Sequence, residues 1–164
     1  MSLRPTFRHV LAAAALAATL FGAGCAGQQK ALEQGAGIGV ASPGSAQDFQ
    51  VNVGDRVFFA VDSSAISPQA GATLDRQAQW LNQYVQYAFA IEGHADERGT
   101  REYNLALGAR RANAVRDYLI SLGIATSRLR TISYGKERPV AVCNDISCWS
   151  QNRRAVTVLN GAGS

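Results

Sequence analysis

Two stretches of this chain repeat their apolar residues every three or four positions, and this spacing constrains the fold more than any other feature. The first stretch follows Ser67-Pro68, a helix-start signal, and the second ends at Gly123, a residue type that commonly closes helices. Their apolar positions are Ala70, Leu74, Ala78, Leu81 and Val85, and then Leu105, Gly108, Ala112, Val115, Leu119 and Leu122. The sequence therefore predicts two amphipathic helices that each bury one face.

Short runs rich in β-branched and aromatic residues surround these two helices. The runs that we interpret as strands are 51–53, 57–61, 89–92, 130–134 and 154–159. The short first run leads into the second, so the predicted order is β-α-β-α-β-β, with a long loop over 135–151. Because no helix joins the last two strands, we expect an α/β fold of the α+β sandwich type, with two helices packed on a mixed four-stranded sheet.

The N-terminus carries basic, apolar and small residues in that order. Arg4 and Arg8 precede a largely apolar run over 10–21, and small residues lead to Cys25. This order is typical of a secretory signal peptide, and the run is too short for the ~30 Å core of a bilayer. Because it also resembles the lipobox of bacterial lipoproteins, we expect residues 1–24 to be a lipoprotein signal peptide and Cys25 to be acylated. The alternative is an ordinary secreted protein with one loose thiol.

Residues 25–50 differ from the rest of the chain in composition. They are rich in Gly, Gln, Ser and Ala and show no sustained period. We expect them to form the lipidated N-terminus and a flexible tether, followed by one folded domain over 51–160.

Three cysteines are present, an odd number for an exported protein. If Cys25 is acylated, Cys143 and Cys148 remain, five residues apart in a polar stretch. An oxidising compartment favours a local disulfide between these two residues.

Composition and motif content exclude several classes of function. Hydrophobic residues make up 47% and charged residues 17% of the chain. Without Arg4 and Arg8 of the predicted signal peptide, the formal net charge of +4 falls to 14 − 12 = +2, which is no nucleic-acid signature. The two histidines, His9 and His94, are too few for a multi-histidine metal site, and the usual nucleotide-binding fingerprints are absent. We therefore expect no metal and no cofactor. An envelope hydrolase would need a nucleophile and a base, and no such cluster accompanies Asp96 and His94, so we expect no enzyme activity.

Residues 91–115 contain the most informative motif in the chain. They read IEGHADERGTREYNLALGARRANAV and resemble, almost residue for residue, the signature of the OmpA C-terminal-like peptidoglycan-binding domain. Supporting matches are Val57–Phe59, Asp62–Ser64, Ser133–Gly135, Pro139 and Asn152–Arg154. The resemblance covers about 51–159, essentially the whole predicted domain.

The residues of this motif suit a ligand that bears both charges. Asp96 stands just beyond a strand end, and Asn104 and Arg111, seven residues apart, share one face of the second helix. The resemblance implies that Asp96 holds the ammonium and Arg111 the carboxylate of diaminopimelate in the peptidoglycan stem peptide, with Asn104 as a further polar contact. Family members commonly carry an acid where this chain has Ala60, and Asp62 is expected to compensate in part.

Lipid-anchored members of this family imply the wider role. They suggest an outer-membrane lipoprotein on the periplasmic face that ties the membrane to the cell wall and supports envelope integrity and cell division. The implied protein partner is the Tol complex, especially its propeller protein TolB. Two alternatives remain open: Asp96 and Arg111 could form a structural ion pair, and the domain could be an envelope interaction module without wall binding.

Overall fold

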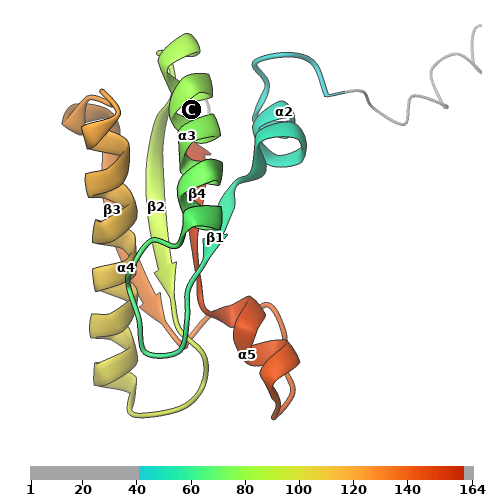
Figure 1. Cartoon of the computed structure of the whole chain (residues 1–164), viewed down its shortest axis with the longest axis vertical. Coiled ribbons are helices and arrows are strands. Elements are labelled where there is room, and N and C mark those ends of the chain that lie inside the picture. The colour runs from blue at the N-terminus through green and yellow to red at the C-terminus, as the bar shows by residue number, and fades with distance from the viewer. Residues whose placement is uncertain (1–40, 161–164) are drawn as a thin grey trace, which may run out of the picture. The chain divides into compact units, whose positions relative to one another are not determined.

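The computed structural model describes residues 41–160 (Figure 1). Its elements, in chain order, are α2 (Ala46–Asp48), the π-helical turn η1 (Phe49–Gly54), β1 (Arg56–Phe58), α3 (Pro68–Gln83), β2 (Ala88–His94), α4 (Arg101–Ser121), the 3-10 turn η2 (Thr126–Arg128), β3 (Leu129–Gly135), α5 (Ile146–Asn152) and β4 (Arg154–Asn160). The predicted signal peptide over 1–24, Cys25 and the tether as far as residue 40 lie outside the described residues.

The four strands form one sheet in the order β1-β4-β2-β3. β4 runs antiparallel to both β1 and β2, whereas β2 and β3 are parallel. α3 and α4 pack against the sheet (Figure 1), and the core between these layers contains Leu74, Leu81, Phe89, Val115 and Leu119. The prediction of an α/β fold with a mixed four-stranded sheet is therefore confirmed.

The signals that predicted the two long helices match the observed helix ends. The Ser67 hydroxyl accepts a hydrogen bond from the Ala70 N–H at 3.2 Å, and Pro68 is the first residue of α3. Gly123 follows α4 with a φ of +92°, a conformation that glycine adopts without strain. The apolar stripes extend less far than predicted, because Val85, Leu105 and Leu122 are exposed.

The start of the domain differs from the prediction. The run 51–53 is part of the π-helical turn η1 and not a strand. Residues 41–50, which the sequence assigns to a tether, pack on the domain: Phe49 is fully buried, and the Trp80 Nε1–H donates to the Asp48 carboxylate at 2.9 Å. The composition of this segment, rich in Gly and Ser, did not predict this packing, because only one aromatic side chain and one carboxylate attach the segment to the domain.

A second correction concerns the loop expected over 135–151, which contains the short helix α5. The Asp145 carboxylate caps this helix by accepting the Ser147 N–H at 2.7 Å. A disulfide joins Cys143 to Cys148, with Cα atoms 5.6 Å apart. Periodicity missed α5 because seven residues are too few to show an apolar stripe.

The two ends of the domain have different roles in the architecture. α2 lies near the upper end in Figure 1, whereas the C-terminal end of β2, the start of α4 and α5 meet at the lower end. The chain therefore enters the described domain far from the loops that follow β1 and β2. Among residues 41–160, no helix is both long and apolar enough to cross a membrane.

Candidate functional site

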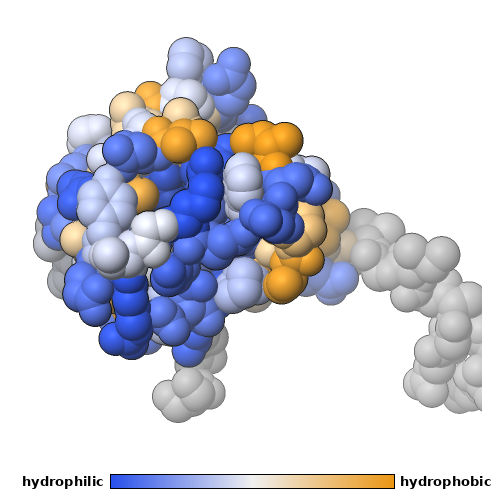
Figure 2. Space-filling view, turned by 90° about the horizontal axis from the view of Figure 1, so that it is seen from below, coloured by the Kyte–Doolittle hydropathy of each residue, from blue (hydrophilic) through white to orange (hydrophobic). Residues whose placement is uncertain are grey.

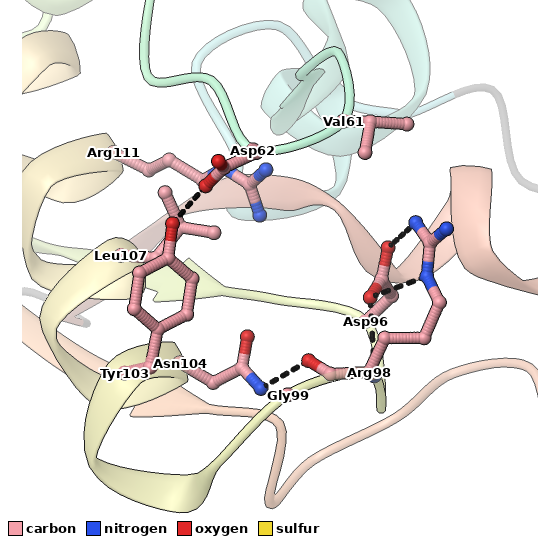
Figure 3. A pocket seen from close by; sticks show the side chains of 9 residues that line it. All are labelled: Val61, Asp62, Asp96, Arg98, Gly99, Tyr103, Asn104, Leu107 and Arg111. Atoms are coloured by element: carbon pink, nitrogen blue, oxygen red, sulfur yellow. Dashed lines mark hydrogen bonds and ion pairs between the residues drawn. The ribbon is translucent and has the colours of Figure 1, made fainter.

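A pocket of about 280 Å³ opens at the lower end of the domain (Figure 3). Its walls come from the loop after β1, the loop after β2 and the first turns of α4. The lining residues are Val61, Asp62, Asp96, Arg98, Gly99, Tyr103, Asn104, Leu107 and Arg111. The structure thus brings all four sequence-predicted binding residues, Asp62, Asp96, Asn104 and Arg111, into one pocket.

Arg111 forms part of the inner wall of this pocket and is fully buried. Its Nε donates to the Ser63 carbonyl at 2.8 Å, Nη1 to the His94 carbonyl at 2.8 Å and Nη2 to the Ala60 carbonyl at 3.1 Å. A guanidinium has five N–H donors, so each terminal nitrogen keeps one more. Arg111 therefore ties the two pocket loops together and retains donors for a ligand.

The charge of Arg111 has no carboxylate partner within 4 Å among residues 41–160. Burial lowers the pKa of Arg111 to about 10, against the attraction of Asp96, and the side chain is still charged at neutral pH. A buried cation that is bonded only to carbonyl oxygens favours an anion in the adjoining space.

Asp96 does not pair with Arg111, so the ion pair considered from the sequence is not formed. Its carboxylate accepts the Arg98 side chain at 2.6 Å and the Arg153 Nη1 at 3.3 Å. Burial opposes ionisation of Asp96, but the hydrogen bonds from Arg98 and Arg153 outweigh it and hold the pKa below its usual range. The group is thus an anion at neutral pH.

Arg98 is the more exposed of the two cations on Asp96. Its side chain is 41% exposed, whereas that of Arg153 is 8% exposed and also donates to the Phe59 carbonyl at 3.1 Å. The Arg98 guanidinium lies 4.3 Å from the ring centroid of Trp149 in α5. An ammonium that approaches Asp96 would therefore displace Arg98 and leave Arg153 in place.

Asn104 braces the loop that carries Asp96. Its Nδ2 donates to the Arg98 carbonyl at 2.7 Å and to the Thr100 carbonyl at 3.1 Å. Figure 3 shows the amide oxygen on the pocket side, away from these bonds. Asn104 thus supports the loop and offers an acceptor to a ligand.

Asp62 and Tyr103 lie side by side at the mouth of the pocket (Figure 3). The Tyr103 hydroxyl donates a hydrogen bond to the Asp62 carboxylate, which raises the pKa of Tyr103. Asp62 has a φ of +55°, the left-handed region that few residues except glycine adopt readily. At Ala60, where a family acid was expected, the chain contributes its carbonyl to Arg111 instead.

Several other motif residues do not line the pocket, and some of them stabilise the loop before β4. The Asn152 side chain accepts hydrogen bonds from the N–H groups of Val140 and Ala141, and Arg154 donates to the Arg138 carbonyl at 3.2 Å, so both fix the loop before β4.

His94 is buried, and neither ring nitrogen has a hydrogen-bond partner among the described residues. Burial, reinforced by Arg154 and Arg138, lowers the pKa of His94 to about 4, so the ring is neutral at pH 7.

Sequence reasoning missed part of this site. Tyr103 and Leu107 line the pocket, and the contact of Arg98 with Trp149 joins it to α5. Tyr103 precedes Asn104 in the sequence, and Leu107 lies one helical turn before Arg111. Helical spacing from the predicted site residues could therefore have indicated both. No sequence signal indicated Trp149, because its contact with Arg98 joins two segments that are far apart in the sequence. In the part of the chain that the structure describes, no group of three potential metal ligands occurs.

Comparison with known proteins agrees with this architecture. The OmpA family matches residues 58–153. The chain is 70% identical over 154 residues to the peptidoglycan-associated lipoprotein of Mesorhizobium japonicum, covering 92% of each chain. It is 68% identical to that of Rhizobium meliloti, covering 92% of this chain and 88% of the relative.

Solved structures of similar proteins have the same fold. The peptidoglycan-associated lipoprotein from Burkholderia pseudomallei has a TM-score of 0.63 and 45% identity, covering 65% of this chain and 90% of that chain. The C-terminal domain of Helicobacter pylori MotB shares the fold, with a TM-score of 0.62 at 22% identity, over 66% of this chain and 86% of that chain. The OmpA family of peptidoglycan-associated lipoproteins is structural and non-enzymatic, in agreement with the prediction of no enzyme activity. The family match spans residues 58–153, and the match to the relative from Mesorhizobium japonicum covers 92% of the chain. The chain therefore belongs to the OmpA family.

Proposed function

We propose that this protein is an envelope lipoprotein that binds peptidoglycan without covalent attachment and so ties the outer membrane to the cell wall. The observation that carries this proposal is the Arg111 guanidinium, which is buried, charged and bonded only to backbone carbonyls beside a pocket that also contains Asp96. A pocket with a fixed cation and a fixed anion suits a ligand that carries one charge of each sign.

The ligand that fits this chemistry in a cell wall is the free end of diaminopimelate. Its carboxylate would accept the remaining N–H donors of Arg111, and its ammonium would pair with Asp96 once Arg98 moves aside. The amide oxygen of Asn104 and the carboxylate of Asp62 would supply further acceptors at the rim. Leu107 and Val61 would contact the aliphatic part of the ligand.

The membrane anchor and the protein partner are inferred from the relatives and from the family resemblance of the sequence. The relatives are named as lipoproteins, and Cys25 would be the acylation site of this chain. Two or more acyl chains are needed for durable membrane attachment, because a single chain binds only marginally. By the same resemblance, the protein acts with the Tol complex and its propeller protein TolB at the periplasmic face of the outer membrane, in envelope integrity and cell division.

Asp96→Asn is expected to weaken binding to purified sacculi by about ten- to a hundred-fold, because it removes the charge that pairs with the ammonium. Co-sedimentation with sacculi measures the effect, and thermal melting verifies that the variant is folded at the assay temperature. The matched control is Asp75→Asn on α3, whose exposed carboxylate accepts the Tyr118 hydroxyl and does not line the pocket. Retention of Asp96→Asn equal to that of Asp75→Asn would contradict the pairing of Asp96 with the ligand, and failure of the wild type to sediment with sacculi would favour the alternative of an interaction module without wall binding.

A further inference from the structure

A second pocket, of about 400 Å³, lies behind the loop that carries Asp96. Its lining includes Ala95, Glu97, Lys136, Ala141 and the disulfide residue Cys143. None of these residues lines the first pocket, and none has a role in the binding proposed above. We call this cavity the rear pocket.

The two pockets share one wall. Along the loop 95–99, Asp96, Arg98 and Gly99 line the first pocket, whereas Ala95 and Glu97 line the rear pocket. The Lys136 ammonium lies against this wall and donates to the Glu97 carbonyl at 3.1 Å and the Gly99 carbonyl at 2.7 Å. A ligand that crosses this wall would therefore reach both pockets.

Lys136 carries a charge without an acidic partner. No carboxylate lies within 4 Å of its ammonium in the described part of the chain, and its two bonds to carbonyls leave a third donor. The Glu97 carboxylate is engaged instead by the Trp149 Nε1–H at 2.5 Å. The rear pocket thus favours an anionic group at its wall.

The rest of the rear pocket is lined mostly by apolar side chains, and its loop is fixed by hydrogen bonds and a disulfide. Ala95, Pro139 and Ala141 contribute short side chains to the lining. The Asn152 side chain fixes the backbone of Ala141 on both sides, accepting its N–H at 3.2 Å and donating to its carbonyl at 2.8 Å. The Cys143–Cys148 disulfide closes the same loop. A preformed and mostly apolar lining of this kind suits an aliphatic side chain, such as the methyl group of alanine.

We propose that the rear pocket binds the terminal alanine that follows diaminopimelate in a stem peptide, with the alanine methyl group against Ala95 and Ala141 and its free carboxylate on Lys136. This inference rests on the proposed function, because it assumes that the first pocket holds diaminopimelate. It adds a preference between stem peptides: those that end in alanine should bind more tightly than those that end at diaminopimelate.

Calorimetric titration of the protein with two muropeptides tests this inference: a tripeptide that ends in diaminopimelate and a tetrapeptide that carries one further D-alanine. The wild type is expected to bind the tetrapeptide about fivefold more tightly, the size of one partly exposed charge-assisted contact. Ala141→Phe fills the rear pocket, and Lys136→Gln removes its cation, so both variants should bind the two peptides equally. The control Arg130→Gln removes an exposed charge on β3 and should keep the preference.

The outcomes separate this inference from the proposed function. Equal affinity of the wild type for the two peptides would overturn the alanine site and leave the diaminopimelate site standing. A preference that survives in both Ala141→Phe and Lys136→Gln would also overturn it, because the alanine would then bind elsewhere. Failure of the wild type to bind either peptide would overturn the proposed function and this inference with it.

Discussion

Arg111→Ala is expected to abolish binding to peptidoglycan, with a loss of a hundred-fold or more, and to lower the free energy of unfolding by about 3 to 5 kcal/mol. The variant removes the cation that the ligand carboxylate requires, and it leaves three carbonyls, those of Ala60, Ser63 and His94, without their donor. The sequence predicts a binding role for Arg111, but its full burial makes it a structural residue as well. Denaturant titration and co-sedimentation with sacculi measure the two effects.

Two further variants separate the structural role of Arg111 from binding. Arg111→Lys keeps a positive charge but can serve fewer carbonyls, so it should lose less stability and still bind at least tenfold more weakly. Arg110→Ala removes the adjacent exposed arginine, which lies over the Tyr103 ring, and should change neither quantity strongly. Wild-type binding by a folded Arg111→Lys would show that the ligand carboxylate does not depend on the guanidinium.

Phe49→Ala is expected to lower the free energy of unfolding by about 3 to 5 kcal/mol, the usual cost of removing a buried phenylalanine ring. Phe49 is fully buried, and its ring centroid lies 4.9 Å from that of Trp80. Chemical denaturation followed by tryptophan fluorescence measures the change. Binding to sacculi should be retained under conditions where the variant is folded, because Phe49 belongs to the turn that follows α2, away from the pocket.

Val51→Ala provides the matched control for Phe49. Val51 lies in the same turn but is 69% exposed, so the substitution should change the free energy of unfolding by less than about 0.5 kcal/mol. Similar small effects of both substitutions would mean that residues before Val51 do not belong to the folded domain, as the sequence first indicated.

The fold was largely predictable because its main signals are local. The helix start at Ser67-Pro68, the glycine after α4 and the strand that ends at His94 are all encoded within a few neighbouring residues. The position of β4 between β1 and β2 was not predictable, because strand order depends on pairing between distant segments. The anchoring of Phe49 was missed for the same reason, since its partner Trp80 lies on α3.

The grouping of the candidate site residues was predictable to a similar extent. Asp96 at a strand end and Asn104 and Arg111 on one helix face had to lie near each other once the fold was assigned, and they do. Their actual partners could not be predicted, because Arg111 binds carbonyls of a loop far away in the sequence and Asp96 pairs with Arg153 next to β4. Backbone carbonyls carry no residue-type signal, so the threefold bonding of Arg111 was invisible in the sequence.

The surface around the pocket is polar, and the disulfide lies close to it in the chain. Seen from the end that carries the pocket, the surface is largely hydrophilic with a few separate apolar patches (Figure 2). Arg98 links Asp96 to Trp149, and Trp149 follows Cys148 of the disulfide directly. The Cys143–Cys148 disulfide thus lies next in the chain to the residue whose ring contacts Arg98 at the pocket.

Recognition of a zwitterion is tested most directly by changing the ligand and leaving the protein intact. Calorimetry should compare a muramyl tripeptide that ends in diaminopimelate with the same peptide acetylated on its free amine and with the peptide amidated on the carboxylate of the carbon that bears this amine. Each modification removes one charge, so each should weaken binding to the wild type by about ten- to a hundred-fold. Unchanged affinity for both modified peptides would contradict the pairing of Asp96 with the ammonium and of Arg111 with the carboxylate.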